Sequence, residues 1–158
     1  MPMLILEDTR QQAYKHETKH KWFEENGIKV DRCRLYVGDY TLPTDQSVCI
    51  DTKKDLQELV QDVCQQHDRF RAELIRAKEA NIQLVVLCEH GGRIRCLEDV
   101  YFWNNPRKKV SPKAMDGWQL FKVLNTMKEK YGVRFEFCDK RQTGKRIVEI
   151  LTNGNDSR

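Results

Sequence analysis

The chain has 158 residues, which is enough to bury one sizeable hydrophobic core but too few for several domains with cores of their own. Its net charge of +4 and pI near 8.7 suit a polyanionic partner without requiring one, because an ordinary soluble surface of mixed charge has the same composition. The sequence has no signal peptide and no apolar run near the roughly 20 residues that span a bilayer, so we expect a cytoplasmic protein without a membrane partner.

The first third of the chain predicts β-strands and a single helix. Residues 3–7 form an apolar run that is typical of a buried strand, and the charged segment 15–26 predicts a helix that ends before Gly27. Three β-prone runs follow, and we expect them to pair with one another as a meander: residues 28–35, 37–42 and 48–52.

Helical spacing of apolar residues begins at residue 56 and predicts two helices. The first covers residues 56–64, and the second follows a polar break at 65–68 and keeps an apolar face through Ala77. Residues 83–88 are nearly all apolar, which indicates a central strand covered on both faces.

The last third of the chain predicts a helix, a strand and a final helix. Asp116 can cap the first of these helices, residues 133–137 alternate as a strand, and residues 143–151 form the last helix. The whole pattern predicts a single α/β domain over residues 1–152, with a central mixed β-sheet flanked by helices, and a flexible C-terminal tail at 153–158.

The pattern that points to chemistry is Asp39 followed by Asp51 and Lys53. The two acids lie in runs that predict a hairpin, so their carboxylates come together, and residue alternation places Asp51 and Lys53 on one face. Two carboxylates beside an ammonium group suit a Mg²⁺ site for phosphodiester hydrolysis, with Mn²⁺ as a substitute. The same spacing also arises by chance on a solvated, charged hairpin edge, and taken alone it favours that interpretation.

Five segments carry a family resemblance, and they occur in the family's order: residues 4–11 (LILEDTRQ), 35–40 (LYVGDY), 51–56 (DTKKDL), 69–74 (RFRAEL) and 84–89 (LVVLCE). They resemble the XPF-type structure-specific nuclease domain, a branch of the PD-(D/E)xK superfamily with a restriction-endonuclease-like fold. The chain departs from the family pattern at Gln11, Asp51 and Thr52, where Glu, Glu and Arg are usual. Because no helix-hairpin-helix segment follows, the chain looks like the stand-alone version found in phages and prophages.

The resemblance implies a metal centre and a role for the lysine. Asp39 and Asp51 would hold the cation together with the backbone carbonyl of Thr52, and Asp8 would supply an outer ligand. Lys53 would orient or help to deprotonate the attacking water, or act mainly as electrostatic support.

Further positions are implied to contact phosphate or to border the site. Arg10 and Arg69 would contact the DNA backbone. Glu73 either faces the site or forms a helix-surface ion pair with Arg69, and both arrangements are open. Asp55 follows Lys53 by two residues, where the family's last acid follows by four, so its place in the site is also open.

Two basic clusters are candidate nucleic-acid contacts. Lys15 and Lys19 lie in the first predicted helix, and Arg107, Lys108 and Lys109 follow three aromatic residues at 101–103. Basic residues beside aromatic ones suit phosphate contact with base stacking, although for residues 101–103 we favour a helix packed on the core.

The function that the resemblance implies is a metal-dependent, structure-specific endodeoxyribonuclease that acts on branched or junction DNA. The alternative is a non-catalytic DNA-binding or scaffold subunit with the same fold. The resemblance also implies that a homodimer is possible, since family members pair through the nuclease domain and a symmetric resolvase needs two sites. The cell would be a bacterium or a phage-infected host.

Overall fold

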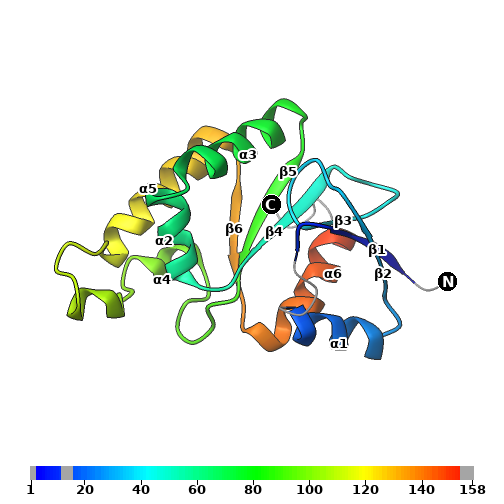
Figure 1. Cartoon of the computed structure of the whole chain (residues 1–158), viewed down its shortest axis with the longest axis horizontal. Helices are drawn as coiled ribbons and strands as arrows, with labels where there is room; N and C mark the ends of the chain where they lie inside the picture. The colour runs from blue at the N-terminus through cyan, green and yellow to red at the C-terminus, as the bar shows by residue number, and fades with distance from the viewer. Residues whose placement is uncertain (1–2, 12–15, 154–158) are drawn as a thin grey trace.

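Six strands form one mixed sheet between two layers of helices (Figure 1). This computed structural model describes residues 3–11 and 16–153. The predicted single α/β domain with a central mixed sheet is confirmed. In chain order the elements are β1 (Leu4–Asp8), α1 (Glu17–Glu25), β2 (Lys29–Cys33), β3 (Tyr40–Thr41), β4 (Val48–Lys53), α2 (Leu56–Cys64), α3 (His67–Glu79), β5 (Gln83–Cys88), α4 (Leu97–Val100), the 3₁₀ turn η2 (Pro106–Lys109), α5 (Gly117–Tyr131), β6 (Arg134–Phe137), the 3₁₀ turn η3 (Lys140–Gln142) and α6 (Thr143–Asn153).

The strand order across the sheet is β2-β1-β3-β4-β5-β6. β4, β5 and β6 are mutually parallel, and β3 runs antiparallel to both β1 and β4. The predicted meander is wrong for β2, which pairs in parallel with β1 at the edge of the sheet. The reason is that α1 connects β1 to β2 as the crossover of a βαβ unit, which makes these two strands parallel. The next strand in sequence, β3, lies on the other side of β1.

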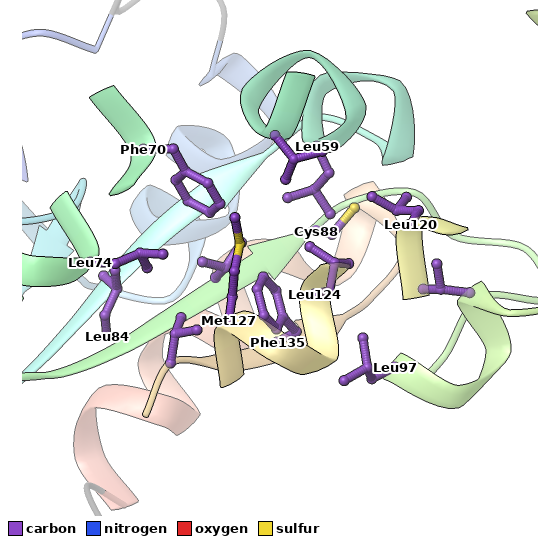
Figure 2. Packing of buried hydrophobic residues seen from close by; sticks show 14 of the residues in the cluster. Leu59, Phe70, Leu74, Leu84, Cys88, Leu97, Leu120, Leu124, Met127 and Phe135 are labelled. Atoms are coloured by element: carbon purple, nitrogen blue, oxygen red, sulfur yellow. The ribbon is translucent and has the colours of Figure 1, made fainter. Parts of the chain in front are cut away.

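Alternation along the central strands fills two hydrophobic layers. Leu84, Val86 and Cys88 of β5 face one layer, while Val85 and Leu87 face the other, which confirms the prediction of a strand covered on both sides. Figure 2 shows the first layer, in which side chains of α2, α3 and α5 pack on the sheet. The second layer lies between the sheet and helices α1 and α6.

The aromatic run at 101–103 differs from the prediction, because α4 ends at Val100. Trp103 is half-buried and packs against the first layer, as expected. Phe102 is 78% exposed, whereas Tyr101 is 46% exposed and its ring meets Phe121 edge-on, so neither residue is buried in the core. The final helix continues through Asn153, the first residue of the predicted tail, and residues 154–158 lie outside the described part of the chain. Within residues 3–11 and 16–153, no helix is long and apolar enough to cross a bilayer.

Gly38 sets the backbone of the turn that leads into β3. It has φ of +73°, and a Cβ added there would lie 2.9 Å from the carbonyl oxygen of Ile50. The next residue, Asp39, donates its backbone N–H to that same oxygen at 2.7 Å. Only glycine therefore allows this turn to come close enough to β4 for Asp39 to pair with it.

We expect Gly38→Ala to destabilise the fold more than Gly27→Ala does. Both glycines have positive φ, but an added Cβ at Gly27 meets nothing within 4 Å, so it reports the backbone strain alone. That strain costs about 1–2 kcal/mol, and the clash with Ile50 should add at least about 1 kcal/mol. Urea unfolding of the two variants measures the difference, and equal losses would show that the close approach to β4 is not needed.

Candidate functional site

Asp39 and Asp51 lie side by side where β3 and β4 meet. Tyr40 pairs with Ile50 in the antiparallel register, which puts Asp39 across from Asp51. Thr52 holds the Asp39 carboxylate, because its backbone N–H and its hydroxyl donate to Asp39 Oδ2 at 2.8 and 3.0 Å. The hairpin predicted from the sequence thus brings the two acids together.

Lys53 shares a face with Asp51 and sits between two carboxylates. Its Nζ is 3.0 Å from Asp51 Oδ2 and 2.8 Å from Asp62 Oδ2, and it lies 5.3 Å from the centre of the Phe70 ring. Burial disfavours the ammonium form, but Asp51 and Asp62 outweigh burial and raise the pKa of Lys53. These two contacts therefore favour the charged ammonium form of Lys53.

Glu73 on α3 is the third acid of a group formed with Asp39 and Asp51. Burial and the nearby Asp51 carboxylate raise the pKa of Glu73 to about 8, and the same two causes raise the pKa of Asp39 well above its ordinary value. The side chain of Asp51 is within hydrogen-bonding reach of both acids, and the backbone N–H of Gly38 donates to Glu73 Oε2 at 3.4 Å. Of the two open arrangements for Glu73, the structure has the one that faces the site.

Asp62 was missed by the sequence analysis. It lies on α2 four residues after Glu58, so both acids lie on the same side of that helix, toward Lys53. The four-residue spacing of Glu58 and Asp62 is the sequence pattern that could have pointed to Asp62. Asp55 has a different role, since its side chain caps α2 by accepting from the backbone N–H of Glu58 at 2.9 Å.

Asp8 holds Arg10 and the backbone of Leu35. Arg10 donates to both oxygens of the Asp8 carboxylate, at 2.6 and 3.2 Å, and the N–H of Leu35 donates to Asp8 Oδ1 at 2.9 Å. Burial opposes ionisation, but these hydrogen bonds outweigh it and lower the pKa of Asp8. Because both oxygens are already occupied, these contacts do not support the prediction of Asp8 as an outer metal ligand. They make it the residue that positions Arg10.

These groups line one open cleft in two adjoining parts. One part, of about 430 Å³, is bordered by Asp62 and Glu73 and by the predicted phosphate contacts Arg10 and Arg69. The other, of about 740 Å³, adds Asp39, Thr52, Lys54 and Lys140. Arg10, Asp51 and Lys53 border both parts. Among the residues that the structure describes, no three His, Cys, Asp or Glu side chains are arranged to hold a metal ion as they stand.

Among the described residues of the two predicted basic clusters, none borders this cleft. Lys19 is 3% exposed and its Nζ is 2.9 Å from Glu89 Oε1, so the structure does not support a DNA contact for it. The reason is that this side of α1 packs toward the end of β5. Lys15 lies outside the described residues. The run Arg107–Lys109 forms η2, which lies at the far end of the molecule from β1, beside α4 (Figure 1).

The chain matches the model of the ERCC4 domain over residues 8–151. It belongs to the ERCC4 domain family. Two solved structures of XPF from Aeropyrum pernix, one of them a complex with DNA, are similar to it, with TM-scores of 0.65 and 0.66 and sequence identities of 16% and 17%. They cover 96% and 99% of this chain, and the chain spans 61% and 66% of theirs. No curated protein matches it significantly. The resemblance to XPF-type nuclease domains is confirmed.

We expect Glu73→Gln to remove a pH-dependent loss of stability. The pKa of Glu73 rises from an ordinary 4.5 to about 8 on folding, so the folded chain keeps a proton that the unfolded chain has released between these values. The free energy of unfolding therefore falls as pH rises through this window. Without divalent cations, the variant should be more stable than wild type by about 2–4 kcal/mol at pH 9, and the difference should shrink toward pH 5.

Urea unfolding in EDTA between pH 5 and pH 9 checks this expectation. Glu79→Gln, at the exposed end of the same helix, serves as the control and should follow the wild-type pH dependence. Parallel curves for wild type and Glu73→Gln would contradict the placement of Glu73 against Asp51.

Proposed function

We propose that the chain is a divalent-metal-dependent endodeoxyribonuclease that hydrolyses phosphodiester bonds in branched or junction DNA. The observation that carries the proposal is the position of Asp51, whose carboxylate lies against Asp39, Glu73 and Lys53 in one cleft. Membership of the ERCC4 family and the XPF-like fold support the same conclusion.

The donor set fits a hard divalent cation. Asp51 is buried, Asp39 and Glu73 are partly buried, and the three carboxyl groups repel one another when ionised, while the Lys53 ammonium lies 3.0 Å from Asp51 Oδ2. A Mg²⁺ or Mn²⁺ ion would satisfy these oxygens, which would draw closer together around it than they lie without it. When bound, the cation supplies a Lewis acid and lowers the pKa of a bound water. The carbonyl of Thr52 stays a predicted fourth ligand.

The chain's own side chains supply the rest of the chemistry. Lys53 is held by Asp51 and Asp62 at the cleft, where its fixed charge orients the attacking water and offsets charge on the phosphate. Arg10 is held in place by Asp8, and Arg69 lies on α3 at the same cleft, so both are positioned to bind phosphate oxygens.

The alternative, a non-catalytic DNA-binding subunit, fits the acids less well. Gathering Asp39, Asp51 and Glu73 in a partly buried cluster raises the pKa of Asp39 and of Glu73 and lowers stability at neutral pH. A scaffold has no use for these destabilising acids, whereas a metal-dependent hydrolase needs them to bind its cation.

Asp51→Asn should abolish cleavage with little effect on DNA binding. The substitution keeps the size of the side chain and removes the charge that holds the cation, so we expect a loss of at least about 100-fold in rate. The assay uses duplex, single-strand, flap, fork and four-way-junction DNA with Mg²⁺, Mn²⁺ or EDTA. Asp68→Asn, a fully exposed acid at the start of α3, is the control and should cleave normally. Undiminished cleavage by Asp51→Asn would place the active site elsewhere.

We also expect cleavage to follow DNA shape and not sequence. The basic and acidic groups of the cleft address phosphate and metal, and neither reads base edges. On junctions with identical arms and scrambled sequences, cuts should stay at a constant distance from the branch point, as a homodimer with two fixed sites would produce. Cuts that move with a particular base step would refute the expectation.

A further inference from the structure

A group of basic side chains lies beside the cleft at the carboxyl ends of β5 and β6. It consists of Arg95, in the loop before α4, and Lys140 and Arg141 of η3, and we call it the η3 basic edge. Arg95 and Arg141 border an open cavity of about 770 Å³, which Gly91 and Phe137 also line. The prediction of DNA contacts from the sequence did not include any of these three residues.

The η3 basic edge is continuous with the acids. Lys140 borders the part of the cleft that contains Asp39 and Asp51, while its chain neighbour Arg141 borders the adjoining cavity. Arg69 and Arg76 of α3 border the other part of the cleft. The acid cluster therefore lies between two basic groups, one on α3 and one at η3.

The loop that carries Arg95 is anchored to η3. His90 forms an isolated β-bridge with Asp139, and Asp139 in turn caps η3 by accepting from the backbone N–H of Arg141 at 2.9 Å. Gly91 sits against Asp139, with φ of +74° and space for an added Cβ only 3.2 Å from a carboxylate oxygen. The two segments are thus held together, which fixes the three basic residues on one surface.

The basic side chains of this edge are available to a ligand. Lys140 is exposed and forms no ion pair with any residue that the structure describes. Arg141 contacts Asp139 at 3.2 Å, but its side chain is 87% exposed, and such a surface pair is weak enough to give way to a phosphate. Cationic groups on both sides of a hydrolytic centre match the repeating negative charge of a nucleic-acid backbone.

We propose that the DNA strand to be cut passes from α3 across the acid cluster to the η3 basic edge, where Arg95, Lys140 and Arg141 bind phosphates on one side of the scissile bond. The basic turn η2 then takes no part in this contact. The proposal rests on the proposed function for the location of the scissile bond, but its test measures binding and does not depend on cleavage.

The test compares two double variants with the same change in charge. Arg95→Glu with Lys140→Glu alters the η3 basic edge, and Arg107→Glu with Lys109→Glu alters η2; all four residues are exposed. Fluorescence anisotropy measures the affinity of each full chain for a fluorescein-labelled DNA fork in EDTA, over a series of KCl concentrations. Thermal melting verifies that both variants fold.

We expect the η3 variant to bind about tenfold more weakly or worse, and to lower the slope of log affinity against log salt by about two units. The η2 variant should bind like wild type, and Lys140→Arg, which keeps the charge, should also bind like wild type. Unchanged binding by the η3 variant, an equal loss in the η2 variant, or a wild-type chain that binds no DNA at low salt would overturn the proposal. If the expected binding pattern appears but no DNA is cut, the path of the strand stands and the proposed hydrolysis fails.

Discussion

The cleft depends on the contact between Asp39 and Asp51, two carboxyl groups side by side on adjacent antiparallel strands. Two neighbouring carboxyl groups repel each other when both are ionised, and nearby groups offset part of that cost. Thr52 donates two hydrogen bonds to Asp39, and Lys53 lies 3.0 Å from Asp51. Each of these groups is in β4 itself, so the strand that brings in the second acid also brings the partners of both acids.

The second hydrophobic layer, on the opposite face of the sheet, helps to position Asp39 against Asp51. Tyr40, next to Asp39, points into that layer, and its hydroxyl donates to Glu7 Oε2 at 2.6 Å. His20 lies 2.7 Å from the same oxygen, which ties β1, α1 and β3 to one buried carboxylate. Because residues alternate, anchoring Tyr40 on one face of the sheet sets the direction of Asp39 on the other. Packing and polar contacts on the face of the sheet that holds Tyr40 thus help to set the position of Asp39 on the other face.

Local rules of sequence were enough for the features that involve neighbouring residues. Alternation placed Lys53 beside Asp51, and the apolar run of β5 indicated a strand covered on both faces. The predictions that were wrong concern contacts between segments that are distant in sequence. β2 pairs with β1 because α1 crosses over, and the same docking of α1 buries Lys19. Glu73 reaches Asp51 only because of how α3 is rotated on the sheet, which no spacing within α3 specifies.

The buried pair of Lys19 and Glu89 has a consequence for how the cleft opens. The pair joins α1 to the end of β5, with both side chains nearly inaccessible to water. Separating them would leave two charges buried without partners. Losing one partner of a buried ion pair costs about 3–5 kcal/mol. Because Glu89 also borders the cleft, the pair fixes α1 beside it. For the DNA proposed above as substrate, any bending or unstacking needed on this side would have to come from the nucleic acid, because the protein surface there is held in place.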